Sequence, residues 1–196
     1  MLAPKTDGLI SEADYLAGEK LADIRHEYVN GCVYAMAGTS RRHNRIAMNM
    51  IRHLPLQDQA GKPCAVHASD IKVRADKAKA FYYPDMVVSC AEDETNEYYL
   101  HKPCLIAEIT SPSTEWKDYA EKLIAYQKLP SLQVYLIVAQ DYPQVTRYSR
   151  DAEGAWEVVR FNELPQTLHL PCTATTLTLA DIYQGIDFTP PAPLEP

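Results

Sequence analysis

The feature that most constrains the fold is a long helix pattern between two apolar strand patterns. The segment LQVYLIVA (132–139) is apolar at nearly every position, which is typical of a strand buried on both faces of a sheet. CLIAEIT (104–110) is similar, and helical spacing of apolar residues runs between them over 114–130, where Pro130 ends the pattern. A helix of this length between two buried strands predicts a right-handed parallel crossover.

Shorter elements surround this unit. Asn30-Gly31 between two β-rich runs predicts a tight hairpin. Helices are expected over 11–25, where Ser11 is a cap candidate, and over 39–54, where Thr39 or Ser40 is one. Further strands are predicted at 64–74 and 81–90, a hairpin at 144–161, and a short strand and helix at 168–186. This order predicts an α/β protein with a mixed sheet.

Length and composition fit one globular domain. The chain has 196 residues, of which 46% are hydrophobic and 23% charged. We expect a single domain over 1–188 and a disordered proline-rich tail over 189–196. The longest apolar run, VYLIVA, is too short to span a bilayer, and the N-terminus has no apolar signal-peptide core. A cytoplasmic protein is therefore expected.

The net charge of −7 argues against a protein that coats nucleic acid without specificity, because that mode of binding needs a basic surface. It does not exclude a nucleic-acid enzyme, in which a local basic patch and an acidic metal site can share one chain.

The cysteines predict no covalent framework. There are five of them, none in a CxxC pair, and most have apolar neighbours. The sequence therefore predicts buried thiols, and neither a disulfide framework nor a structural zinc site.

Two carboxylates lie in otherwise apolar strand patterns. Asp85 follows Pro84 in YYPDMVVS, and Glu108 lies within LIAEIT. Charges on buried strands are usually paired or bind metal, and two close carboxylates repel unless a cation joins them. Mg²⁺ suits this role because it takes oxygen ligands and is often held by one or two carboxylates. Alternatively, Asp85 caps a turn after Pro84 and Glu108 pairs with a lysine.

The helix after Glu108 carries a third candidate. Asp118 and Lys122 are four residues apart and share a helix face. They form either an ordinary surface ion pair or, because the first turns of this helix follow the Glu108 strand, part of the same site.

These pieces together carry a resemblance. YYPDMVV, LIAEITSPST and DYAEKLIAYQKLPSLQVYLIV, in that order, resemble the Uma family of restriction-endonuclease-like proteins, within the PD-(D/E)XK nuclease superfamily. HEYVNGCVYAMAGTSRRHNRI and LTLADIY are similar to the family's N-terminal hairpin and helix and its C-terminal helix. The resemblance covers about Ser11 to Ile186. It implies a restriction endonuclease-like mixed sheet flanked by helices, with an added N-terminal helix-hairpin and a C-terminal hairpin.

The resemblance also implies roles. Asp85 and Glu108 would hold Mg²⁺ or Mn²⁺, and Lys122 would be the catalytic lysine, with Lys117 and Lys128 as alternatives. The superfamily's usual lysine position, two residues after the second acid, is Thr110 here. Additional candidates are Glu27, His43 and Asp118. Arg41, Arg42, Arg45, Lys72 and Arg74 are candidate phosphate contacts or, alternatively, ordinary surface charge.

The function implied is hydrolysis of phosphodiester bonds in nucleic acid, with DNA the first expectation, by a homodimer. The alternative is a non-catalytic binding protein on a nuclease-like scaffold, because a fold does not determine a function. A Cys/His hydrolase is disfavoured, because no cysteine has an activating context and the histidines are scattered.

Overall fold

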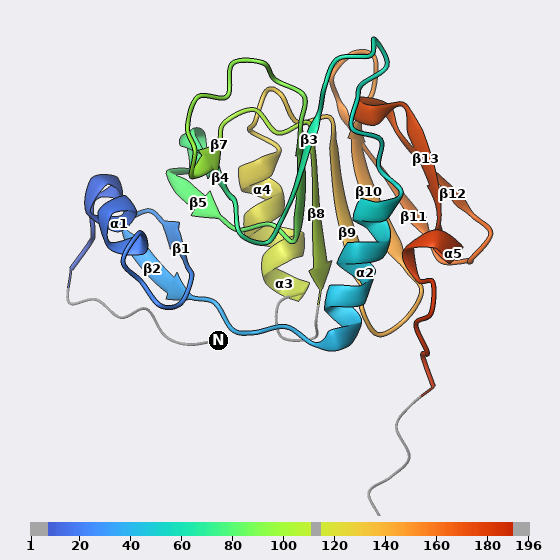
Figure 1. Ribbon diagram of the computed structural model, residues 1–196, viewed down its shortest axis with the longest axis horizontal. Helices are drawn as coiled ribbons and strands as arrows, with labels where there is room; N and C mark the ends of the chain where they lie inside the picture. The colour runs from blue at the N-terminus through green and yellow to red at the C-terminus, as the bar shows by residue number, and fades with distance from the viewer. Residues whose placement is uncertain (1–7, 111–114, 190–196) are drawn as a thin grey trace, which may run out of the picture.

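A six-stranded mixed sheet lies at the centre of the molecule (Figure 1). The computed structural model describes residues 8–110 and 115–189. The strand order is β11-β10-β9-β8-β6-β3, and β8 and β9 run parallel while the other neighbours are antiparallel. The strands are β3 (Ala65–Ala68), β6 (Met86–Ser89), β8 (Leu105–Thr110), β9 (Val134–Ala139), β10 (Val145–Arg150) and β11 (Trp156–Phe161). The predicted parallel crossover and the 144–161 hairpin are confirmed.

Both faces of this sheet are covered. One face packs against α2 (Arg41–Arg52), α5 (Leu179–Ile182) and a hairpin of β12 (Thr167–Leu170) and β13 (Thr175–Thr178), which the turn η3 (Pro171–Thr173) joins. The other face packs against α3 (Glu115–Lys117), η2 (Asp118–Lys122) and α4 (Leu123–Tyr126). Side chains alternate, so that Ala107 belongs to the α2 core and Ile106 to the α4 core. Glu108 therefore lies on the α4 side.

A second, five-stranded sheet has the order β2-β1-β5-β4-β7, and α4 lies between the two sheets (Figure 1). Its elements are β1 (His26–Val29), β2 (Cys32–Ala35), β4 (Lys72–Ala75), β5 (Ala80–Tyr82) and β7 (Tyr99–Leu100), with a 3-10 turn, η1 (Asp76–Ala78), between β4 and β5. The helix α1 (Glu12–Glu19) packs on this sheet through Tyr15, which stacks on Tyr28.

The division into two larger sheets differs from the single mixed sheet predicted. The segment 64–74 reads as one strand, but Ser69 has a φ of 40°, and the chain changes direction there. The strand β3 before this residue joins the six-stranded sheet, whereas β4 after it joins the five-stranded sheet.

Local signals in the first fifty residues are confirmed. Asn30 and Gly31 have φ values of 49° and 89°, the conformation that a two-residue hairpin turn needs between β1 and β2. The hydroxyl of Ser11 accepts a hydrogen bond from the Asp14 amide at the start of α1, and Ser40 caps α2 in the same way.

The crossover helix is interrupted, which the sequence does not indicate. A π-helical turn, η2, separates α3 from α4. In a π turn the backbone bonds to the fifth residue rather than the fourth, so side chains five residues apart come onto one face.

The cysteine prediction is wrong for four of the five residues. The structure pairs Cys64 with Cys90 and Cys104 with Cys172 in disulfides, and Cys32 is free. The partners are 26 and 68 residues apart, so no short spacing pattern marks them.

No helix in the described ranges is long and apolar enough to cross a bilayer. The expected tail lies outside those ranges, apart from Thr189.

Candidate active site

A buried group of opposite charges lies between the two sheets. Glu108 on β8 and Glu27 on β1 are 3% and 4% exposed, and Lys122 at the end of η2 is 6% exposed. The ammonium of Lys122 lies 2.9 Å from Oε1 of Glu108 and 3.1 Å from Oε1 of Glu27. Two carboxylates from different sheets thus share one lysine.

Lys117 joins this group through the π turn. Its ammonium contacts the second oxygen, Oε2, of Glu27. Lys117 and Lys122 are five residues apart, a spacing that would place them on different faces of an α-helix. The π turn brings both ammonium groups to Glu27.

Glu27 is held in its charged form. Burial acts to raise the pKa of its carboxyl, but the nearby charges of Lys122 and Lys117 outweigh burial, and the pKa lies below its ordinary value of 4.5. Glu27 therefore carries the negative charge that allows two lysines to be held at the edge of a hydrophobic core.

Tyr126 contacts the same oxygen of Glu108 as Lys122 does. Its hydroxyl donates a 3.0 Å hydrogen bond to Oε1 of Glu108. Complete burial, and then the charge of Glu108, raise the pKa of Tyr126 well above its ordinary value. The phenol thus remains a hydrogen-bond donor, and it restrains the Glu108 carboxylate together with Lys122.

Asp85 lies beside the same part of β8. Met86 pairs with Ala107 in the β6–β8 register, so Asp85, one residue earlier, comes next to Glu108 and Ile109. Its Oδ2 accepts a 2.7 Å hydrogen bond from the Ile109 amide and lies 3.1 Å from Nε2 of His43 on α2. The Asp85 carboxylate is therefore tied to the backbone of the residue that follows Glu108.

The donor chemistry fits a hard divalent cation. Asp85 and Glu108 would offer carboxylate oxygens from neighbouring chain segments, the ligand type that Mg²⁺ or Mn²⁺ prefers. Within the described ranges, however, Asp85, Glu108 and Glu27 do not form a group whose ligand oxygens all lie within 4.8 Å. Glu27 instead contacts the two lysines, which leaves Asp85 and Glu108 as the candidate ligands.

The five candidate phosphate contacts have different environments. Arg42 bonds to Asp141 and to the carbonyl of Asp187. Arg74 pairs with Glu12 and Asp76. Lys72 is buried and donates to the hydroxyl of Tyr83.

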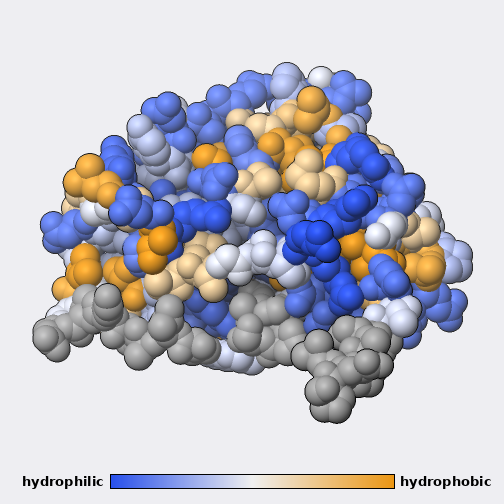
Figure 2. Space-filling view, turned by 60° about the horizontal axis from the view of Figure 1, so that its bottom comes forward, coloured by the Kyte–Doolittle hydropathy of each residue, from blue (hydrophilic) through white to orange (hydrophobic). Residues whose placement is uncertain are grey.

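Arg41 and Arg45 are exposed on α2, one turn apart, and form no ion pair with any described residue. They lie on α2, two residues before and two residues after His43, whose side chain contacts Asp85. Figure 2 shows that this end of the molecule, toward which β8 points in Figure 1, is mostly hydrophilic, with the apolar side chains in separate patches.

Two parts of the predicted site are not described. The side chain of Asp118 and residues 111–114, which hold the SPST segment, lie outside the described part of the chain. Lys128, the second alternative lysine, is exposed.

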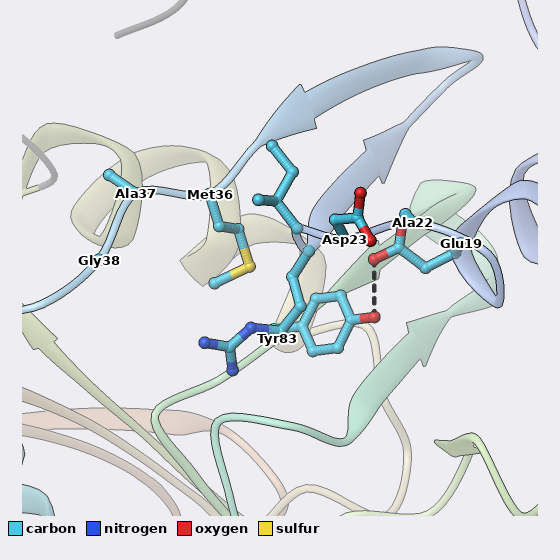
Figure 3. Close-up of a pocket in the computed structure, with 9 residues that line it drawn as sticks. Glu19, Ala22, Asp23, Met36, Ala37, Gly38 and Tyr83 are labelled. Carbon is cyan, nitrogen blue, oxygen red and sulfur yellow. Dashed lines mark hydrogen bonds between the residues drawn. The ribbon is translucent and has the colours of Figure 1, made fainter.

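A cavity of about 290 Å³ lies next to this region, between the chain that leads into and out of the β1–β2 hairpin and Tyr83 (Figure 3). The Tyr83 hydroxyl donates a 2.9 Å hydrogen bond to Glu19 across it. Glu19 and Asp23 line the cavity, and the one arginine in its wall, Arg25, is bonded to Asp70. Two carboxylates make it a poor place for a phosphate group.

Lys117 and Tyr126 are the members of the site that sequence reasoning did not assign. The sequence offers Lys117 only as an alternative to Lys122, and in an α-helix the two would lie on different faces. Tyr126 fits the apolar stripe of the helix pattern over 114–130, which by itself indicates only a core position. A tyrosine on the buried face one turn after a candidate lysine is the signal that could have indicated its contact with Glu108.

Comparison with known proteins supports a single family. The sequence pattern of the Uma2 family, described as "Putative restriction endonuclease", matches residues 13–181. Two uncharacterized proteins of Synechocystis sp. are each 29% identical to this chain. The first, slr1290, aligns over 91% of this chain and 94% of its own length, and the second, sll1609, over 80% and 89%.

A solved structure has the same fold. It is a crystal structure described as "a putative nuclease belonging to DUF820" from Anabaena variabilis, with a TM-score of 0.71 and 17% sequence identity, covering 89% of this chain and 97% of that one. This likeness supports the mixed α/β architecture, and the family match extends over most of the sequence. The chain therefore belongs to the Uma2 family of restriction endonuclease-like proteins.

Proposed function

We propose that this protein is a metal-dependent endonuclease that hydrolyses phosphodiester bonds of nucleic acid, with DNA as its substrate. The observation that carries the proposal is the buried Lys122–Glu108 contact beside Asp85. Burying such a group costs free energy, which a merely structural role could avoid with apolar side chains. The membership of the family supports the nuclease assignment.

Asp85 and Glu108 are the residues that would hold Mg²⁺ or Mn²⁺. A divalent ion bound there supplies an activated water and stabilises negative charge on the phosphate oxygens. The Ile109 amide and the Tyr126 hydroxyl orient the two carboxylates before any ligand arrives.

Lys122 would place a positive charge next to the reacting phosphate, where negative charge increases in the transition state. Glu27 is a positioning residue in this proposal, because it fixes the ammonium of Lys122 through an ion pair and Lys117 balances its remaining charge. Arg41 and Arg45 would contact the nucleic-acid backbone, since phosphate contacts need exposed cations.

A homodimer is proposed as the active unit for duplex DNA, because cleavage of two strands needs two such sites. Analytical ultracentrifugation with and without duplex DNA tests this part separately from the chemistry. A monomer that still cleaves both strands would contradict it.

The main test is a cleavage assay with supercoiled plasmid, single-stranded DNA and RNA, each with Mg²⁺ or Mn²⁺. The wild-type protein is compared with Asp85→Asn and Lys122→Met, which keep the size of each side chain. Lys128→Met is the matched control, because it removes an exposed lysine from the same segment. We expect cleavage by the wild type and the control, and at least about a 100-fold loss in the other two.

Wild-type rates of cleavage by Asp85→Asn would refute the metal-dependent mechanism. If the wild type neither cleaves any of these substrates nor binds either cation, the non-catalytic binding function replaces the nuclease.

A further inference from the structure

Four cysteines from separate parts of the chain come together in the core next to α2. Cys64 precedes β3, Cys90 follows β6, Cys104 precedes β8, and Cys172 lies in η3. The sulfurs of Cys90 and Cys104, which belong to different disulfides, are 3.8 Å apart. The sulfurs of Cys90, Cys104 and Cys172 all lie within 4.8 Å of one another. The two disulfides therefore form one group, called here the cysteine cluster.

The cysteine cluster is separate from the candidate active site. Cys104 immediately precedes β8 and Glu108 lies near its end, and four residues of extended chain span about 13 Å. In Figure 1 the β8 arrow points toward α3, away from the end at which the strand begins. An activity of the cluster would thus be independent of the nuclease chemistry.

The state of the cluster depends on the redox environment. Disulfides persist in oxidising compartments and are rare where thiols are kept reduced. With a dithiol reductant, each disulfide takes up two electrons and two protons and becomes two thiols, while the dithiol is oxidised to its own disulfide. Full reduction leaves four thiols. The sulfurs of Cys90, Cys104 and Cys172 lie within 4.8 Å of one another, and the sulfur of Cys64, which is not in that group, is bonded to the sulfur of Cys90 before reduction.

We propose that the reduced cysteine cluster is a zinc site in which Cys64, Cys90, Cys104 and Cys172 bind one Zn²⁺ ion. Four thiolates are a common ligand set for structural zinc, with zinc–sulfur distances of about 2.3 Å. In a regular tetrahedron with that bond length, two sulfurs are about 3.8 Å apart. The separation between Cys90 and Cys104 has this value. Binding would release the four thiol protons.

The protein backbone holds these residues before a metal binds. The Cys104 amide donates to the carbonyl of Val88 at 2.8 Å, and its carbonyl accepts from the Gln133 amide at 2.9 Å. The Cys64 amide donates to the carbonyl of Leu56 at 2.9 Å. Cys64, Cys104 and Cys172 are buried, and Cys90 is partly exposed, which gives an ion a route of entry.

The ligand type and the spacing favour zinc over other ions. Thiolates are soft ligands that Mg²⁺ and Mn²⁺ do not prefer. In an iron–sulfur cluster the cysteine sulfurs bound to different iron atoms lie further apart, because inorganic sulfides and several iron atoms lie between them. A single zinc ion would join the loop after α2, the six-stranded sheet and the β12–β13 hairpin, so its expected role is structural.

The test uses the full chain. The protein is reduced with a phosphine and incubated with Zn²⁺, and unbound metal is then removed by gel filtration. Inductively coupled plasma mass spectrometry should then find about one zinc ion per chain. We expect the zinc to be lost in Cys90→Ser and Cys172→Ser. Cys32→Ser is the matched control, since Cys32 is the one described cysteine outside the cluster, and it should keep the zinc.

Cobalt gives a second measurement that needs no variant. Reduced wild-type protein with Co²⁺ should show the visible bands of a tetrahedral ion and the charge-transfer absorption of cobalt–thiolate bonds. The reduced wild-type protein should also unfold at a higher temperature with Zn²⁺ than without it, because the ion binds only the folded site. The proposal is overturned if reduced wild type retains no more zinc than Cys90→Ser. If that variant does not fold, a cobalt spectrum without thiolate absorption overturns it.

Discussion

The ammonium of Lys122 lies 2.9 Å from the carboxylate of Glu108, although one belongs to the crossover helix and the other to the strand before it. The contact is buried, and it connects the helix to β8 at the point where Asp85 bonds to the Ile109 amide. A buried ion pair at this position fixes two charged groups close to the end of the sheet.

Replacing Glu27 by Gln should destabilise the protein. Lys117 and Lys122 would lose a buried counter-charge, and breaking such a group costs about 3 kcal/mol in the free energy of unfolding. Urea denaturation at neutral pH measures this change. Glu157→Gln, an exposed glutamate on β11, is the control and should change stability by less than about 0.5 kcal/mol. Equal stabilities of the two variants would contradict the role given to Glu27.

The stability that Glu27 contributes should depend on pH in one direction. The folded-state pKa lies below the ordinary value of 4.5, so the contribution is fully present above that pH and is lost as the pH falls through the folded-state pKa. The difference in unfolding free energy between wild type and Glu27→Gln should therefore be constant from about pH 6 to 8 and shrink below about pH 4. A difference that grows on acidification would show that the folded-state pKa is raised instead.

Asp85→Ala and Asp85→Asn should separate structure from chemistry. Alanine leaves the Ile109 amide without its acceptor and should cost about 1–3 kcal/mol. Asparagine keeps a carbonyl oxygen at that place and should unfold nearly as wild type does, yet both variants should lose cleavage. Thermal unfolding and a plasmid assay on the same preparations give the two readouts. Cleavage by Asp85→Asn would mean that the carboxylate acts only as a hydrogen-bond acceptor.

Much of the fold follows from local patterns. Asn30-Gly31, the caps at Ser11 and Ser40, and the apolar strand 132–139 each specify their element through short-range chemistry. The five-stranded sheet was missed because the strand-breaking conformation of Ser69 is unusual for a serine. The cysteine pairs were missed because only the folded chain brings together residues so far apart in sequence.

The candidate site was predictable in part for a similar reason. Charges in apolar strands identified Asp85 and Glu108, whereas the contact of Lys117 with Glu27 depends on a π turn that has no sequence signature here. The alternative that Glu108 pairs with a lysine also agrees with the structure, because its partner is the candidate catalytic lysine itself.

Deleting Ala120 should convert the π turn to regular α-helix. With Tyr126 and Lys122 fixed by the core, residues before the deletion would rotate by about 100° and carry Lys117 away from Glu27. The deletion and Lys117→Met should then destabilise the protein by similar amounts, and the two changes together should not add. Chemical denaturation of the three variants tests this, and full additivity would contradict the role of the π turn.

The most direct test of the central claim is isothermal titration of Mn²⁺ and Mg²⁺ into the wild type and into the double variant Asp85→Asn/Glu108→Gln. Cys90→Ser serves as a control, because it alters the cysteine cluster and leaves both carboxylates in place. The account predicts binding to the wild type and to Cys90→Ser, and its loss in the double variant. Binding of the same strength to the double variant, or none to the wild type even with nucleic acid present, would contradict a metal site at Asp85 and Glu108.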